Sequence, residues 1–282
     1  MSQTITLLLG QQRYRLQKHW IAADLAAGIS SVAVLSDGKV AVLLRGSPCL
    51  VRVFDADANL INNWTVEGIR CAHQISALPD GGMLICDLDG HQVVALNQHG
   101  QAIWTLGTPD QPKWQAPFNH PTHAIVCPKG ELYVSDGYGN ACIHHFDAQR
   151  TLVSSFGQHG TAALTPGQDQ AQFSVPHTLA HDGQLLYVAD RENSRVLMLD
   201  KHGRVHDQIT TLYKPMAIAL DGQGRLFVSD QTAALSMFDT HRKLIGRCRV
   251  TAVYGHGLAY HPNGSIFIAE MLSDGLTCLV PC

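Results

Sequence analysis

The sequence contains no apolar run close to the ~20 residues that span a membrane. Its amino end, MSQTITLLLGQQRYRLQKHW, has neither the basic segment nor the small-residue cleavage site of a secretory signal. Charged residues are few, at 15% of 282 residues, and the net charge of −3 leaves no basic surface typical of nucleic-acid or anionic-membrane binding. These absences predict a cytoplasmic chain that binds neither membrane nor nucleic acid.

Paired cysteines are also missing. The eight cysteines form no C-x-x-C pair and no regular spacing, so reduced, buried thiols are a simpler interpretation than a disulfide framework. The sequence has no G-x-S-x-G, phosphate-binding or dinucleotide-binding motif. The residue type that stands out is histidine, with 16 copies.

A repeated pattern organises the chain. Six segments each contain a short apolar strand, a turn such as Asp37-Gly38 or Asp182-Gly183, a second apolar strand that ends on a polar residue, and a third strand. Short antiparallel strands without helical periodicity, repeated at this spacing, predict an all-β, six-bladed β-propeller that forms a single domain over residues 1–282. The second strands are expected at 41–45, 83–87, 132–136, 186–190, 226–230 and 266–270.

The two ends of the chain complement each other in this repeat. The last copy stops before a fourth strand, and a strand-like segment, 13–20, precedes the first copy. We therefore expect this N-terminal strand to complete the last blade and to close the ring, which removes exposed sheet edges and favours a monomer. Two longer insertions, 108–116 and 159–172, are expected to be loops on one rim.

Histidines alternate at one position of the repeat. The innermost strand of each blade faces the central channel, and alternate blades of a six-bladed ring are about 120° apart. Three imidazoles can therefore converge on one axial point, which is the donor set of a catalytic zinc or similar ion with an open fourth position. The alternative is a polar channel without metal. In ring order the six positions are Ser30, His73, Thr122, His177, Met216 and His256.

A second ring of positions ends the second strands. Five of its six members are acidic and are expected to be architectural, because a carboxylate beside a turn binds main-chain N–H groups. Arg45 breaks the series, Arg191 follows Asp190, and Tyr138 lies two residues after Asp136. Either a site role or a local role suits these last two: an ion pair with Glu192 for Arg191, and packing in the turn for Tyr138.

Other polar candidates have weaker cases. His123 is one residue out of the ring register, so we expect it at the rim or behind the histidines. His144 and His145 are adjacent in a third strand, where one of the pair is expected to face solvent. Cys71 and Cys86 lie near the ring, but burial as small residues explains them.

Two segments, 118–140 and 172–195, carry a resemblance to a known family. FNHPT followed by DGYGN, and QFSVPH followed by DRENSR, resemble the NHL-repeat propeller of peptidyl-α-hydroxyglycine α-amidating lyase and its bacterial relatives. The similarity runs from about residue 13 to residue 270.

The resemblance implies an activity and a site. In that family three histidines bind a catalytic zinc, a tyrosine acts as the base and two arginines flank the site. Transferred here, His73, His177 and His256 would bind zinc or another divalent ion such as iron, and Tyr138 would accept the substrate's hydroxyl proton. Arg45 and Arg191 would hold a carboxylate or steady developing charge. The implied reaction is carbon–nitrogen cleavage of an α-hydroxyglycine carbinolamide to an amide and glyoxylate.

The chain also departs from the family pattern. The third histidine is followed by Gly257 instead of an aspartate tied to a structural calcium, so no calcium is carried over. The expected substrate is a small molecule or peptide-like compound that need not be a secreted hormone. Two alternatives stay open: a non-catalytic NHL propeller that binds proteins, and a propeller lactonase or other hydrolase. The second suits the site less well, since such sites gather acidic ligands for harder ions.

Overall fold

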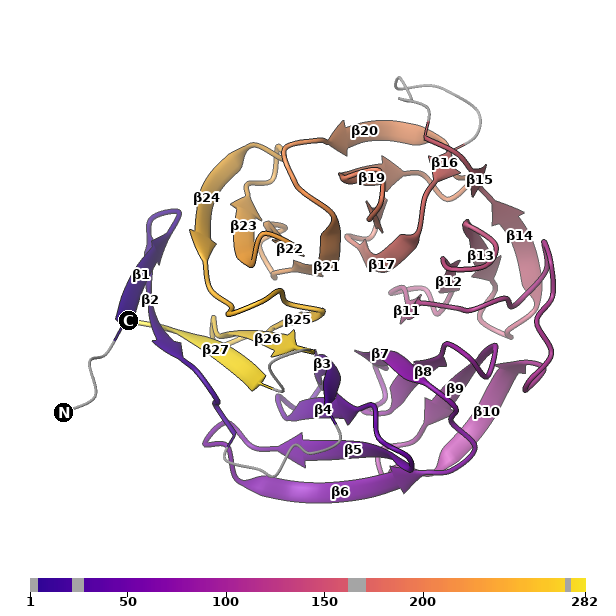
Figure 1. Cartoon of the computed structure of the whole chain (residues 1–282), viewed down its shortest axis with the longest axis horizontal. Helices are drawn as coiled ribbons and strands as arrows, with labels where there is room; N and C mark the ends of the chain where they lie inside the picture. The colour runs from indigo at the N-terminus through magenta and orange to yellow at the C-terminus, as the bar shows by residue number, and fades with distance from the viewer. Residues whose placement is uncertain (1–4, 22–27, 162–170, 272–274) are drawn as a thin grey trace.

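The structure, a computed structural model, describes residues 5–21, 28–161, 171–271 and 275–282. Six antiparallel sheets follow one another around a central axis, so the molecule is a six-bladed β-propeller (Figure 1). The predicted all-β propeller is confirmed. Within the described residues there is no helix, and hence none long and apolar enough to cross a membrane.

Each of the first five blades has four strands, numbered outward from the axis. Blade 1 contains β3 (Ile29–Val34), β4 (Val40–Leu44), β5 (Cys49–Phe54) and β6 (Leu60–Val66). Blade 2 contains β7 (Ala72–Ala77), β8 (Met83–Asp87), β9 (Gln92–Leu96) and β10 (Ala102–Gly107). Blade 3 contains β11 (His123–Val126), β12 (Leu132–Asp136), β13 (Cys142–Phe146) and β14 (Leu152–Phe156). Blade 4 contains β17 (Pro176–His181), β18 (Leu186–Asp190), β19 (Arg195–Leu199) and β20 (Val205–Ile209). Blade 5 contains β21 (Pro215–Leu220), β22 (Leu226–Asp230), β23 (Ala234–Phe238) and β24 (Leu244–Arg249).

Blade 6 joins the two ends of the chain. It contains β25 (Gly257–Tyr260), β26 (Ile266–Glu270) and β27 (Gly275–Pro281), and β2 (Gln12–Gln17) pairs antiparallel with β27. The N-terminal strand thus lies where the repeat pattern placed it, although it ends at Gln17 instead of residue 20. A further strand, β1 (Ile5–Leu9), pairs with β2 and gives this blade a fifth strand that the repeat pattern did not predict.

Apolar clusters lie between neighbouring blades. There are six among the described residues, and each joins residues of two adjacent blades, so together they occupy every seam of the ring. Second strands such as β4 are buried along their whole length, whereas outer strands such as β6 alternate between exposed and less exposed side chains. Full burial of one Val, Leu or Ile side chain contributes about 1.5–3 kcal/mol, so the seams supply most of the stabilisation.

The acidic residues that end the second strands hold the loops that lead into the innermost strands. Asp87 accepts from the N–H groups of Arg70 and Cys71, the latter at 2.8 Å, just before β7. Asp190 accepts from Ser174 N at 2.7 Å, just before β17, and is fully buried. Each carboxylate therefore ties the end of a second strand to the loop before the innermost strand of the same blade.

The two insertions lie between blades. The 108–116 segment has no strand, in keeping with a loop. The 159–172 segment begins and ends in a short parallel pair, β15 (Gln158–His159) and β16 (Gln172–Phe173), and its residues 162–170 lie outside the described part of the chain.

A matched pair of glycines tests the packing of a seam. Gly100 has φ of +76°, and a Cβ there would lie 2.4 Å from the Trp64 ring of blade 1; Gly68 has φ of +77° and open space around it. Gly68→Ala should cost about 1 kcal/mol for the left-handed backbone, and Gly100→Ala about 1–3 kcal/mol more for overpacking. Urea unfolding measures both, and an equal loss in the two variants would contradict the seam contact.

Candidate metal centre

Three innermost strands bring the alternating histidines together. His73 is the second residue of β7, His177 is the second residue of β17, and His256 directly precedes β25. Their ring centroids lie 4.8–4.9 Å apart in all three pairs, and one ligand atom from each ring lies within 4.8 Å of the others. All three side chains are buried. The convergence predicted from the ring register is therefore present.

The other three ring positions orient these imidazoles through their main chain. Nδ1 of His73 binds the carbonyl oxygen of Thr122 at 2.7 Å, and Nδ1 of His177 binds that of Met216 at 2.6 Å. Nδ1 of His256 binds that of Ser30 at 2.7 Å. Because a carbonyl only accepts, each Nδ1 carries the proton and each Nε2 keeps a lone pair.

The Nε2 atoms suit a metal ion. Those of His73 and His177 are buried and have no hydrogen-bond partner. Histidine ligands typically donate their other ring N–H to a carbonyl in this way, which fixes the tautomer and the ring orientation. The donor set of three imidazoles fits zinc or a similar borderline ion and leaves a coordination position open.

Burial keeps the three rings neutral. It lowers the pKa of His73 and of His177 well below the ordinary value, with a further contribution from the neighbouring imidazoles, and it lowers the pKa of His256 to about 3. A metal ion binds the neutral ring, so the site needs no proton release at neutral pH.

Tyr138 lies in the turn after β12, at the open side of the histidines. Its ring centroid is 5.6 Å from that of His73 and 6.1 Å from that of His177, and 41% of the residue is exposed. Arg191 donates from a terminal nitrogen to the Tyr138 hydroxyl at 2.8 Å. Arg191 Nε also donates to Glu192 at 2.9 Å, so Arg191 makes the local ion pair as well as the contact with Tyr138.

Arg45 follows β4 and approaches the histidines from blade 1. Its Nε donates to the carbonyl oxygen of Ala72, the residue before His73, at 2.9 Å. Its positive charge contributes to the lowered pKa values of His73 and His256, and that of Arg191 contributes at His177 and His256. The two arginines thus act on the same cluster from different blades. The structure brings all six predicted residues to one end of the channel.

The chain is similar in sequence to known amidating lyases. The chain is 29% identical to peptidyl-α-hydroxyglycine α-amidating lyase 1 of Drosophila melanogaster over 196 residues, which is 64% of this chain and 36% of that protein. It is 32% identical over 162 residues to a probable lyase of the same name from Caenorhabditis elegans, covering 51% of this chain and 45% of the relative. The predicted resemblance is confirmed. In both cases the match spans less than half of the relative's length, and no family model matches the chain.

Solved structures agree on the fold. A streptogramin B lyase superposes with a TM-score of 0.67 at 12% identity and covers 98% of this chain and 100% of that one. A gluconolactonase from Xanthomonas campestris superposes with a TM-score of 0.68 at 14% identity and covers 97% and 91%. At these identities the similarity establishes the propeller fold and carries no information about the reaction.

Three weaker histidine candidates lie outside the centre. His123 turns toward blade 4, where its Nδ1 accepts from Leu179 N at 3.0 Å, and burial lowers its pKa to about 4. The expectation that His144 or His145 faces solvent was wrong, because both are buried. The third strand is enclosed by its blade and the neighbouring blades, and His145 stacks on Tyr133 at 4.4 Å between centroids.

His144 belongs to a second compact group of possible metal ligands, with Asp136 and Cys142. Its Nε2 lies 3.1 Å from Asp136 and its Nδ1 lies 2.7 Å from Ser155, so both ring nitrogens are occupied. Burial raises the pKa of Cys142 to about 12, which keeps it a thiol. This group is a packed hydrogen-bond cluster. Cys86 is likewise buried, and Cys71 is partly buried with a raised pKa.

Sequence reasoning missed the role of the three ring positions without histidine. Ser30, Thr122 and Met216 have chemically different side chains. Their main-chain carbonyl groups bind Nδ1 of the three histidines. The ring register marked these positions as facing the channel. It gave no sign that a main-chain oxygen of one blade would meet a ring of the next.

The depressed pKa of His123 predicts how stability depends on pH. The folded protein binds a proton at this ring only near pH 4, whereas the unfolded chain binds one near pH 6.5, so stability falls as the pH falls between these values. His123→Asn should make the fall shallower by up to about 1.4 kcal/mol per pH unit. Urea unfolding of the metal-free protein from pH 7 to pH 4 tests this, and parallel curves for the two proteins would contradict it.

Proposed function

We propose that this chain is a metal-dependent carbon–nitrogen lyase that cleaves an α-hydroxyglycine-type carbinolamide to an amide and glyoxylate. The observation that carries the proposal is the cluster of three buried neutral imidazoles, whose Nδ1 atoms are all bound to carbonyls, beside the hydrogen-bonded pair of Tyr138 and Arg191. The relatives named as amidating lyases support the same chemistry.

Nε2 of His73, His177 and His256 would hold the metal, with zinc as the first choice and iron as the second. When bound, the ion supplies Lewis acidity that lowers the pKa of the substrate's hydroxyl. A calcium ion is not part of the proposal, since Gly257 offers no ligand side chain.

Tyr138 is the proposed proton acceptor. Its oxygen, held by the Arg191 N–H, would act as a phenolate that the adjacent guanidinium stabilises, and it becomes a neutral phenol when it takes the substrate's hydroxyl proton. The electron pair of the broken O–H bond forms the new C=O bond of glyoxylate. The C–N bond breaks, its electron pair moves to nitrogen, and that nitrogen takes a proton to complete the amide, so no water is consumed.

Arg45 and Arg191 are the proposed binding groups for the substrate's carboxylate. Arg45 uses Nε for Ala72, and its terminal nitrogens make no bond to the described residues. A guanidinium with two free N–H groups on one edge matches a carboxylate in a bidentate geometry. Two cations facing one site favour a substrate with a free carboxylate. We further propose that the chain acts as a cytoplasmic monomer on such a small or peptide-like compound.

Removing one imidazole tests the centre. Wild-type protein should contain close to one equivalent of zinc or iron and should release glyoxylate from an α-hydroxyglycine amide, whereas His177→Ala should lose both the metal and the activity. Plasma mass spectrometry and a glyoxylate assay measure these, with His123→Asn as a buried-histidine control that keeps the metal. Unchanged turnover in His177→Ala would refute the lyase.

The same assay separates the alternatives. A lactone that is hydrolysed faster than the carbinolamide is cleaved would favour a hydrolase. No metal in wild-type protein, even after reconstitution with zinc, iron and manganese, would favour a non-catalytic propeller.

Tyr138→Phe tests the proton acceptor. The variant keeps the ring beside His73 and removes only the hydroxyl, so metal content should stay at the wild-type value while kcat falls by roughly 10²–10⁴-fold, as for loss of a general base. Steady-state kinetics at saturating substrate provide the measurement. A kcat within threefold of wild type would assign the proton transfer to another group.

A further inference from the structure

His256 is held differently from the other two histidines. His73 and His177 lie inside β7 and β17, whereas His256 precedes β25 and therefore lies outside a strand. Its own N–H bonds to Ala269 O at 2.8 Å, which leaves its carbonyl to be satisfied by another group. A buried carbonyl without a partner is costly, so this group needs a donor.

In blade 2 a hydroxyl from the preceding blade supplies such a donor, and in blade 4 a hydroxyl binds the carbonyl one residue earlier. Ser30 Oγ donates to the carbonyl oxygen of His73 at 2.6 Å, and Thr122 Oγ1 donates to that of Pro176, next to His177, at 2.8 Å. The equivalent residue before blade 6 is Met216, which has no hydroxyl. Ser229 Oγ of blade 5 donates instead to the carbonyl oxygen of Gly255, the residue before His256, at 2.8 Å, so the carbonyl of His256 itself is left to another donor.

Gln74 of blade 2 supplies the donor for the His256 carbonyl. It lies in blade 2, immediately after His73, and its Nε2 donates to the carbonyl oxygen of His256 at 2.8 Å and lies 3.3 Å from His256 Nδ1. Its Oε1 accepts from Ser31 Oγ of blade 1 at 2.5 Å. The two bonds together fix which end of the amide faces His256.

The surroundings leave this amide little freedom. Gln74 is only 3% exposed and Ser31 only 1%. A Cβ on Gly257 would lie 2.7 Å from Ser31 Cα, so the residue after His256 has to be glycine for Ser31 to occupy its place. Blades 1, 2 and 6 are thus joined beneath the histidines by one buried hydrogen-bond chain.

We infer that Gln74 is a positioning residue for the metal centre, which holds His256 so that its imidazole meets those of His73 and His177. The inference rests on the proposed metal site, and it assigns to Gln74 a role that neither the ring register nor the resemblance assigns. Loss of a group that orients a metal ligand typically lowers metal affinity by 10–100-fold.

Gln74→Met tests the inference, because methionine keeps the length of the side chain and removes the amide. The matched control is Gln92→Met. Gln92 is also a buried glutamine of blade 2, 4% exposed, and its Nε2 donates to Gly68 O and to Asp87 instead of to one of the three histidines. The zinc dissociation constant is measured by competition with a chromogenic chelator, and the melting temperature is measured without metal.

We expect Gln74→Met to weaken zinc binding by at least tenfold and Gln92→Met to leave it within twofold, with both variants melting below wild type. Ser31→Ala, which removes the donor that holds the Gln74 amide, should give a smaller loss of affinity in the same direction and serves if Gln74→Met does not fold. Wild-type zinc affinity in both Gln74→Met and Ser31→Ala would overturn the inference. An equal loss of affinity in Gln74→Met and Gln92→Met would overturn it as well.

A measurement on metal-free protein separates this inference from the proposed function. Nitrogen NMR of the imidazoles should show the His256 ring signals displaced and broadened in Gln74→Met, because the ring is no longer held in one position, with those of His177 unchanged. Failure of wild-type protein to bind any metal would refute the metal site and leave this test of Gln74 standing. An unchanged His256 in Gln74→Met would refute the positioning role.

Discussion

Closure of the ring by antiparallel pairing of β2 with β27 is the constraint on which the rest of the molecule depends. Without that pair, blade 6 would present an open edge and its seam with blade 5 would lose Leu9 and Tyr14, while Trp20, which follows β2, would no longer be held in its seam with blade 1. His256 and Ser30 lie on opposite sides of this seam, joined by a 2.7 Å hydrogen bond. The centre therefore exists only in a closed ring. Figure 1 shows the two ends of the chain meeting at this blade.

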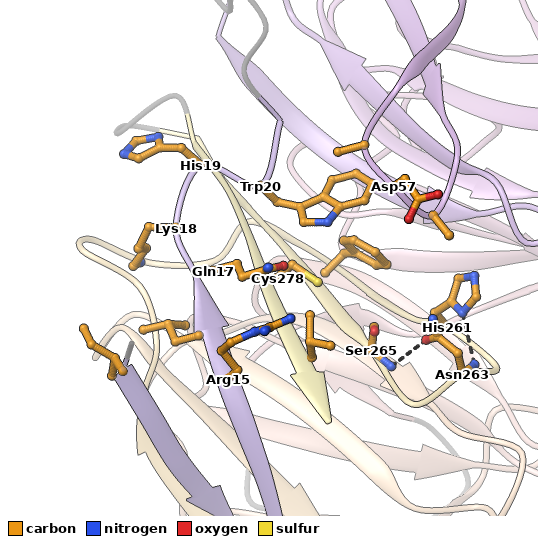
Figure 2. A pocket seen from close by; sticks show the side chains of 16 residues that line it. Arg15, Gln17, Lys18, His19, Trp20, Asp57, His261, Asn263, Ser265 and Cys278 are labelled. Atoms are coloured by element: carbon orange, nitrogen blue, oxygen red, sulfur yellow. Dashed lines mark hydrogen bonds between the residues drawn. The ribbon is translucent and has the colours of Figure 1, made fainter. Parts of the chain in front are cut away.

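The same seam carries a cavity of about 880 Å³. Figure 2 shows Arg15, Trp20 and His261 around it, from the closing strand and from the turn after β25. Trp20 fills the inner part of the seam, with its ring 4.8 Å from that of Phe267 and 6.2 Å from that of Phe54. These ring contacts join the closing segment to blades 1 and 6.

The six equivalent ring positions of the propeller fall into two alternating sets of three. One set supplies rings to the axis, and the other supplies the carbonyl groups that orient them. Each bond crosses from one blade to the next, so the tautomer of every ring is set by the angle between neighbouring blades. Burial completes the arrangement by keeping the rings neutral, while Tyr138 remains open to solvent on the side where a substrate would approach.

The sequence by itself determined the propeller, the number of blades and the three converging histidines. It could do so because each blade is a local unit, and because one position of a repeat necessarily returns to the axis at every copy. Tyr138, Arg45 and Arg191 could be placed near that axis for the same reason. The segments around blades 3 and 4 also carried the resemblance to the lyases.

Only the tertiary structure decided the contacts between copies of the repeat. The burial of His144 and His145, the fifth strand β1 and the partner of each Nδ1 depend on how blades pack against one another. The contact of Gln74 with His256 joins residues 182 positions apart and passes over the blade between them. A repeat pattern specifies where each residue lies within its own blade, and such contacts arise from the rotation of one blade relative to the next.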